Sequence, residues 1–216
     1  MKIAICIKQV PDSWAEKKMA GGVLDRAGVD AVLNDLDEYA VEEALRIVEA
    51  NSPTKEAGEA SGHSITLISM GPERATEAIR KALSMGADDA ILVSDPALAG
   101  SDALATSLVL AAVIKKGNYD LVLCGTESTD ARMSVIPAMI SQRLGWAQLT
   151  FAGKVAVNPA TTTVEIERVT EFGNQVMSAK FPALLSVIEK INEPRYPSFK
   201  GIMAAKKKLI TTMSLS

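Results

Sequence analysis

The chain has 216 residues, of which 48% are hydrophobic and 23% charged, with a formal net charge of −3. This composition is that of a globular protein and excludes an intrinsically disordered chain. The acidic balance provides no electrostatic surface for nucleic acid. No apolar run reaches the roughly 18 residues that a membrane-spanning helix needs, so we expect no direct membrane insertion.

Short apolar runs alternate with helical patterns along the first two thirds of the chain. The runs carry apolar residues on both faces, as parallel strands covered by helices on both sides require, and they lie at residues 3–7, 65–68, 90–93 and 121–124. Apolar residues at helical spacing predict helices between and after these strands, over residues 36–50, 72–85, 101–117 and 134–144. This alternation predicts a layered α/β domain with right-handed crossovers.

The ends and faces of these helices carry their own signals. Asp35 and Glu38 have the spacing of a capping box at the start of the first helix. Ser101 is the expected cap of the third helix, which would turn Leu104 and Leu108 toward the core.

Two regions break this rhythm. Residues 9–33 separate the first strand from its helix by more than an ordinary loop, which indicates a functional excursion or disorder. After Pro159 the apolar residues alternate with polar ones, and Gly173-Asn174 interrupts the alternation, which predicts an antiparallel hairpin. The run 183–188 then predicts a last buried strand.

The predicted fold class is therefore α/β: a layered, mostly parallel sheet flanked by helices, similar to Rossmann-like adenine-nucleotide-binding domains, with an antiparallel hairpin and a C-terminal arm. We expect an α/β domain over residues 1–191, followed by a partner-recognition loop and arm over residues 192–216.

The chain offers few groups for catalysis. His63 is the only histidine, which argues against a Ser-His-Asp triad or a multi-histidine metal site. Cys6 and Cys124 lie inside apolar runs and are expected to be buried free thiols. The pair Glu42-Glu43 and the run 206–208 of three lysines are interpreted as solvated surfaces.

One loop has the chemistry of a ligand site. The strand at 121–124 ends in Gly125-Thr126-Glu127-Ser128-Thr129-Asp130, and a helix follows. Ligands of open α/β sheets bind at the carboxyl ends of strands, and helix N-termini present N–H groups to phosphate. Gly125 would permit close backbone approach, while Ser128, Thr129 and Ser134 can donate hydrogen bonds. The loop matches neither the P-loop nor the G-x-G-x-x-G pattern.

Four blocks of the sequence carry a family resemblance, which extends over essentially the whole chain. They read IAICIKQVPD at 3–12, LNDLDEYAVEEALRI at 33–47, MGPERATEAIRKALSMGADDA at 70–90 and NEPRYPSFKGIMAAKKK at 192–208. On these residues the chain resembles the β subunit of electron-transfer flavoprotein. The resemblance implies a heterodimer with an FAD-carrying α subunit and an AMP without redox role in this chain. The heterodimer would accept electrons from acyl-CoA dehydrogenases and related flavin dehydrogenases, and pass them to a membrane quinone oxidoreductase, without bond-making chemistry of its own. With no transit peptide in the sequence, we expect a location in the bacterial cytoplasm.

The resemblance also implies two sets of site residues. AMP contacts are expected at Cys6, Asn34, Asp35, Leu36, Asp37, Met70, Gly125, Thr126, Thr129, Asp130, Arg132, Ser134, Val135 and Ile136. Contacts with the dehydrogenase are expected at Tyr196, Pro197, Ser198, Phe199, Lys200 and Ile202, with Phe199 as the hydrophobic anchor. Trp14 is expected to pack into its own loop, with approach to the partner's flavin as the alternative.

This chain departs from the family pattern at several positions. Ser134-Val135-Ile136 stands where relatives often carry Asn-Gln-Thr, which reduces the side-chain contacts available to phosphate. Val169 follows Arg168 where the family has a glutamate that helps to free the flavin domain. Two alternatives therefore stay open: a bifurcating variant with a second FAD in this cavity and NADH as donor, and a stand-alone ATP-binding domain.

Overall fold

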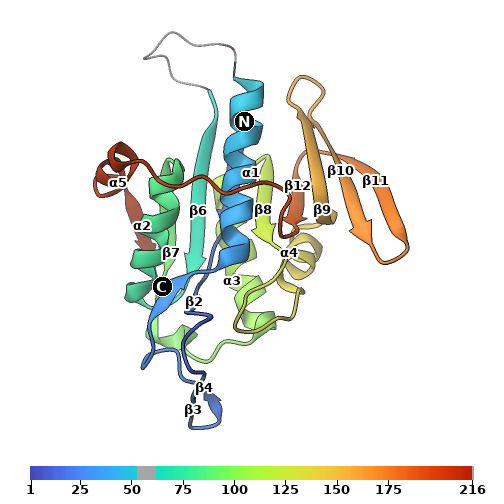
Figure 1. Ribbon diagram of the computed structural model, residues 1–216. Coiled ribbons are helices and arrows are strands. Elements are labelled where there is room, and N and C mark those ends of the chain that lie inside the picture. The colour runs from blue at the N-terminus through green and yellow to red at the C-terminus, as the bar shows by residue number, and fades with distance from the viewer. Residues whose placement is uncertain (53–61, 216) are drawn as a thin grey trace.

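A single mixed sheet forms the centre of the molecule (Figure 1). In the computed structural model, which describes residues 1–52 and 62–215, nine strands pair in the order β11-β10-β9-β12-β8-β1-β6-β7-β13. Their bounds are β1 (Lys2–Cys6), β6 (Ser64–Met70), β7 (Asp89–Val93), β8 (Leu121–Gly125), β9 (Ala147–Asn158), β10 (Thr163–Thr170), β11 (Gly173–Lys180), β12 (Ala183–Val187) and β13 (Ile210–Met213). The seven strands β9-β12-β8-β1-β6-β7-β13, in this order across the sheet, are all parallel to their neighbours. Strands β10 and β11 are antiparallel additions at the β9 edge. The α/β class predicted from the sequence is confirmed.

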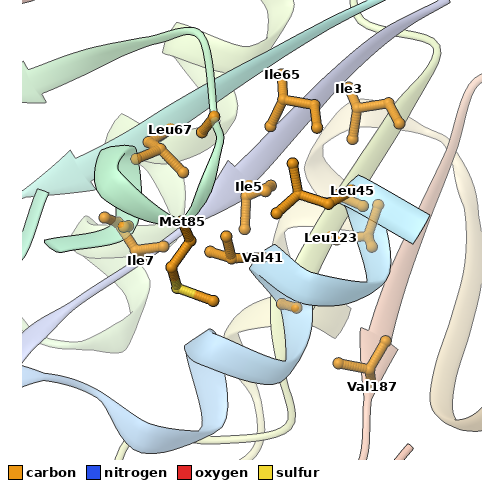
Figure 2. Packing of buried hydrophobic residues seen from close by; sticks show 14 of the residues in the cluster. Ile3, Ile5, Ile7, Val41, Leu45, Ile65, Leu67, Met85, Leu123 and Val187 are labelled. Atoms are coloured by element: carbon orange, nitrogen blue, oxygen red, sulfur yellow. The ribbon is translucent and has the colours of Figure 1, made fainter. Parts of the chain in front are cut away.

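Helices cover both faces of the parallel part of the sheet, because its inner strands, such as β1 and β8, are buried on both faces. On one face, Ile3 and Ile5 of β1 pack with α1 (Asp35–Asn51) and α2 (Thr76–Met85). Figure 2 shows this layer, with Ile5 beside Val41 of α1. On the other face, the intervening residue Ala4 packs with α3 (Ala103–Gly117) and α4 (Ile136–Leu144). Burial on both faces stabilises the fold by about 25 cal/mol for each Å² of apolar surface removed from water.

The order of the strands places a topological switch point beside β1, and we call the region between the carboxyl ends of β1 and β8 the candidate crevice. From β1 the chain passes through α1 to β6 and through α2 to β7, always in the same direction across the sheet. It then crosses by α3 to β8, which pairs with the opposite side of β1. The carboxyl ends of β1 and β8, at Cys6 and Gly125, therefore flank the point where the winding reverses. Ligands of open α/β sheets bind at this kind of position.

The antiparallel hairpin is present as predicted, with β10 and β11 joined next to Gly173. Strand β9, the helix α5 (Phe199–Ala205) and strand β13 are additional elements that the sequence patterns did not indicate. The excursion after β1 contains two small pairings, β2 (Gln9–Pro11) with β5 (Ala31–Leu33) and β3 (Met19–Ala20) with β4 (Val23–Leu24).

Three predictions about helix ends and faces were wrong. The N-cap of α1 is Asn34, and neither it nor a capping box provides a side-chain cap, because the Asn34 amide bonds elsewhere. Asp102 rather than Ser101 caps α3, accepting a hydrogen bond from the Ala105 N–H at 2.8 Å. Leu104 and Leu108 are more than half exposed. Helix α3 is apolar around most of its circumference, so spacing alone could not identify the face that is buried.

Candidate functional site

The first turn of α1 lies against the end of β8. A Cβ atom at Gly125 would lie 2.6 Å from Oδ1 of Asp37 and 2.8 Å from the backbone oxygen of Leu36, so only glycine fits there. Gly125 therefore permits the close approach of helix α1 to β8. The sequence analysis had expected this glycine to permit the approach of a ligand. Asp37 is buried, and its Oδ2 accepts a hydrogen bond from the backbone N–H of Lys8 at 2.8 Å. This contact places the start of α1 over the crevice between β1 and β8.

Asn34 connects this helix start to the loop that follows β8. Its Nδ2 donates to the Glu127 carbonyl at 2.9 Å, and its Oδ1 accepts from the Thr129 N–H at 3.1 Å. The side chain is fully buried. Thr126 holds the same loop from the other side by donating to the Val187 carbonyl at the end of β12. The loop after β8 is therefore fixed at both of its flanks.

Asp130 is the charged centre of the loop. Its carboxylate accepts from Nζ of Lys8 at 2.7 Å and from Nε of Arg26 at 2.9 Å, and its side chain is 1% exposed. Burial alone would raise the pKa of Asp130, but hydrogen bonds from Lys8, Ser128 and Arg26 outweigh burial and lower it. Because Arg26 belongs to the excursion after β1, this ion pair ties the excursion to the loop.

Helix α4 begins at the end of this loop with no side-chain cap. Arg132 and Ser134 adopt left-handed backbone angles, with φ of 50° and 54°. Uncapped N–H groups at the start of a helix attract anions, because they carry partial positive charge and need acceptors. The hydroxyl of Ser134 donates to Glu127 Oε2 at 2.8 Å, so it is already bonded within the loop. A donor to an anion at this helix start is therefore a backbone N–H, and Pro137 has none to give.

An apolar wall completes the crevice. Cys6 and Cys124 are buried free thiols, as the sequence predicted. The structure also pairs them in register on β1 and β8. Met70 and Ile136 pack against the same cluster. The Cys6 side chain and burial both raise the pKa of the Cys124 thiol, which makes it a poor nucleophile. Cys124 therefore lines the crevice as an apolar group.

These features fit an adenine nucleotide at the level of donor chemistry. Of the predicted contacts, the structure brings one set to the hydrogen-bonded network around the loop after β8: Asn34, Leu36, Asp37, Gly125, Thr126, Thr129, Asp130 and Ser134. Cys6, Met70 and Ile136 share an apolar cluster, and Val135 precedes α4. Asp35 and Arg132 have exposed side chains. The backbone donors at the start of α4 suit a phosphate, and the apolar wall suits a base.

Lys8, Arg26 and Glu127 belong to this network, although the sequence reasoning did not name them as site residues. No local pattern reveals them, because Lys8 and Arg26 bond across more than a hundred positions of the chain. Trp14 is 94% exposed, so the expectation that it packs into its own loop was wrong. Arg168 donates to the Thr150 carbonyl at 2.9 Å.

A second exposed surface follows β12. Tyr196 is 97% exposed and Phe199 is 80% exposed, with Ile202 and Met203 beside them on α5. The predicted recognition loop is thus largely a short helix, capped by Ser198, which accepts from the Gly201 N–H at 3.0 Å. Pro197 is partly buried and Lys200 is exposed. Exposed aromatic and apolar side chains that lie close together are a candidate interaction surface.

The segment before this surface is held by α1, which corrects a prediction about charged residues. Glu42 and Glu43 are buried, not solvated. Glu42 pairs with Arg195, and Glu43 accepts from Nδ2 of Asn192 at 2.9 Å. Lys208 is also not simply solvated, because its Nζ donates to the Ala87 carbonyl at 2.6 Å.

A cavity of about 530 Å³ lies at the opposite edge of the sheet, next to the residues that precede β8, β9 and β12. Two of its charged groups are bonded within the chain: Asp120 accepts from the Lys2 N–H, and Arg143 donates to Ser107. We assign no ligand to it.

The described residues contain neither a metal-binding cluster nor a membrane-spanning helix. Within residues 1–52 and 62–215, no cluster of three or more His, Cys, Asp and Glu side chains could hold a metal ion. In the same part of the chain, no helix is long and apolar enough to cross a membrane.

A mostly parallel, doubly wound sheet covered by helices on both faces, with an exposed apolar segment after β12, defines the chain as an α/β protein of the doubly wound class. Residues 21–216 match the family model of the electron transfer flavoprotein domain. The chain is 49% identical over 217 residues to the electron transfer flavoprotein subunit beta of Mycobacterium tuberculosis strain H37Rv, covering 99% of this chain and 79% of the relative. It therefore belongs to the electron transfer flavoprotein β-subunit family.

More distant relatives agree with this assignment. The electron transfer flavoprotein subunit beta of Megasphaera elsdenii is 39% identical over 222 residues, which cover 99% of this chain and 78% of the relative. The protein FixA of Azotobacter vinelandii is 37% identical over 212 residues, which cover 95% of this chain and 72% of the relative. Members of this family are electron carriers associated with flavin, and the name of the β subunit implies an α subunit as partner.

Asp37 gives a test of this geometry through pH. Burial, opposed by hydrogen bonds from Asn34, Lys8 and Gly125, raises the pKa of Asp37 from 3.8 to about 7. Between about pH 4 and pH 7 the folded protein holds a proton that the unfolded chain has lost. The free energy of unfolding therefore falls as pH rises through this window, by at most about 1.4 kcal/mol per pH unit. Asp37→Asn abolishes this contribution.

We expect the stability of Asp37→Asn relative to wild type to increase steadily from pH 5 to pH 7, measured by urea unfolding at several pH values. Asp130→Asn is the matched control. Its pKa is lowered, so its contribution is lost only as pH falls below about 4, and its stability difference should be flat over the same range. A flat difference for Asp37→Asn as well would show that the carboxyl titrates normally.

Proposed function

We propose that this chain is the β subunit of a heterodimeric electron carrier whose α subunit holds FAD. The heterodimer accepts electrons from flavin dehydrogenases, including acyl-CoA dehydrogenases, and delivers them to a membrane quinone oxidoreductase. The observation that carries the proposal is the similarity of almost the whole chain to named β subunits, which includes both the crevice loop and the displayed segment. The FAD, when bound, supplies the one-electron chemistry, and this chain supplies binding surfaces.

In this proposal, the crevice between β1 and β8 holds AMP. The phosphate lies at the uncapped start of α4, where backbone N–H groups of the loop can donate to its oxygens. Asn34 fixes the loop through its two hydrogen bonds, and Asp130 holds Lys8 and Arg26 beside it. Cys6 and Met70 form the apolar wall next to the base. The AMP has a structural role, because the residues around it include no activated nucleophile.

In this proposal, the exposed residues around Phe199 bind the dehydrogenase. Phe199 is the hydrophobic anchor, with Tyr196, Pro197, Ser198, Lys200 and Ile202 around it. An anchor of this kind suits a redox partner that must bind and leave quickly, because a few buried side chains carry most of the affinity of a small interface. Trp14, at the exposed end of the excursion tied to Asp130, approaches the flavin of the α subunit.

The nucleotide content of the assembled heterodimer tests the proposal. We expect one FAD and one AMP per heterodimer when the co-expressed complex is denatured and the released nucleotides are separated by chromatography. Two FADs would favour the alternative in which a second flavin occupies the crevice. ATP or ADP without flavin would overturn the electron-carrier function.

Ser134→Asp tests the position of the phosphate. A carboxylate at the start of α4, beside Glu127, repels a phosphate at the same place, so AMP should be lost or greatly reduced while FAD content is unchanged. The measurement is again the nucleotide released from the purified complex. Ser134→Ala is the matched control and should retain AMP, because it removes the hydroxyl without adding charge. Full AMP content in Ser134→Asp would move the site elsewhere.

Phe199→Ala tests the docking surface. Loss of a buried aromatic anchor weakens an interface by about 2–4 kcal/mol, so the apparent KM of the dehydrogenase for the heterodimer should rise by one to three orders of magnitude. Because Phe199 is 80% exposed in the free chain, the fold and the nucleotide content should not change. Phe172→Ala is the matched control, since Phe172 is 99% exposed in the hairpin turn. An unchanged KM for Phe199→Ala would show that the anchor lies elsewhere.

A further inference from the structure

The exposed segment Tyr196–Met203 raises a physical problem. Its apolar side chains face solvent, and α5 contains only seven residues. A helix this short is not stable alone in water, so contacts outside it must hold its shape. Figure 1 shows the chain crossing the outer surface of α1 before it reaches α5 beside α2.

The residues before the exposed segment are clamped to α1. Arg195 donates from Nε and Nη2 to the two carboxylate oxygens of Glu42, at 2.7 and 2.9 Å. It also donates from Nη1 and Nη2 to Glu49, at 2.6 and 3.1 Å. Asn192 adds bonds from Nδ2 to the Tyr39 carbonyl and to Glu43. We call Arg195, Glu42 and Glu49 the arginine clamp.

Pairing in the arginine clamp favours the charged form of Arg195 and of Glu49. Hydrogen bonds to Glu42 and then to Glu49 raise the pKa of the Arg195 guanidinium. The hydrogen bond from Arg195 lowers the pKa of Glu49. Forked pairing of this kind fixes direction as well as distance, because the guanidinium and the carboxylate must lie nearly in one plane.

The residues after the exposed segment are held by α2. Arg80 donates from Nη1 to the carbonyl oxygens of Ala205 and Lys208, at 2.5 and 2.7 Å. Lys208 returns a bond from Nζ to the Leu83 carbonyl at 3.1 Å. A Cβ atom at Gly201 would lie 2.6 Å from the Ser84 carbonyl oxygen, so α5 lies directly on α2. The exposed segment is thus fixed at both ends.

We propose that Arg195 is a positioning residue for partner docking, which acts by holding Phe199 and its neighbours in the conformation that the partner binds. This inference rests on the proposed function, because it takes the exposed segment to be the docking surface for a flavin dehydrogenase with an apolar pocket. Arg195 itself does not need to touch the partner. Its effect arises because a segment fixed before binding loses less conformational entropy on binding.

The size of the effect follows from the population of the competent conformation. If loss of the clamp lowers the fraction of molecules with a correctly placed segment to about one tenth, the apparent KM rises about tenfold. At saturating concentration the turnover number is unchanged, because the flavins and the distance between them are the same once the complex has formed.

The test uses the assembled heterodimer as electron acceptor for a flavin dehydrogenase and compares four chains: wild type, Arg195→Gln, Phe199→Ala and the double variant. We expect Arg195→Gln to raise the apparent KM about tenfold, with unchanged turnover at saturation and unchanged FAD and AMP content. In the Phe199→Ala background the same substitution should have almost no further effect, because the side chain that it positions is gone.

A second variant guards against a loss of folding. Arg195→Gln leaves Glu42 buried without its partner, and a buried unpaired charge is destabilising. Arg195→Gln/Glu42→Gln removes both charges, and Glu42→Gln keeps the size of the buried side chain, so this double variant should show the same rise in KM. Arg143→Gln is the matched control, because Arg143 also bonds within the fold, to Ser107 and Leu104, but lies far from the exposed segment along α4. Its KM should equal that of wild type.

The outcomes separate this inference from the proposed function. An unchanged KM in both Arg195 variants, with Phe199→Ala impaired, overturns the positioning role and leaves the docking surface in place. Equal and independent effects of Arg195→Gln in the two backgrounds also overturn it, because they would show a structural role that does not act through Phe199. An unchanged KM in Phe199→Ala overturns the docking surface itself.

Discussion

The first turn of α1 approaches the end of β8 so closely that no side chain fits at position 125. This contact fixes the helix on the sheet, together with the burial of Ala40, Val41 and Ala44 against the strands. The candidate nucleotide site and the exposed segment Tyr196–Met203 both depend on this placement of α1. At its start, Asn34 orients the loop after β8, and further along, Glu42 and Glu49 hold Arg195. One helix therefore sets the geometry of two surfaces that are distant in the sequence.

The acidic residues of α1 show how its two sides differ. Asp37 points into the protein, where burial raises its pKa to about 7. The carboxyl is therefore mostly neutral below that pH. Glu42 is equally buried, but it has a guanidinium as its partner. Burial raises the pKa of Glu43, and the hydrogen bond from Asn192 and the charge of Arg46 oppose this shift. Buried carboxylates are destabilising unless they are paired or hydrogen-bonded, so the helix retains each acid together with a specific contact.

The sequence predicts the layers of this fold well, because strands that are apolar on both faces, alternating with apolar or amphipathic helices, allow few other arrangements. It also places the loop after β8 at the correct edge, since the order of strands and helices decides that. It fails where the deciding partner is distant in the chain. Glu42 looks like an ordinary surface residue until Arg195 is brought to it across 153 positions. Helix α5 is hidden for a related reason, because its residues form a helix only when α2 supports them.

The distance between the two surfaces suggests how they are related. Asp37 and Glu49 lie twelve residues apart on α1, which corresponds to about 18 Å along a helix. A packed helix of this length transmits position, but it has no second arrangement into which it could move without exposing buried residues such as Val41. A ligand shifts an equilibrium only if it binds two states differently. A nucleotide in the proposed site would therefore stabilise one geometry of the exposed segment and would not switch it, which is the behaviour required of a scaffold.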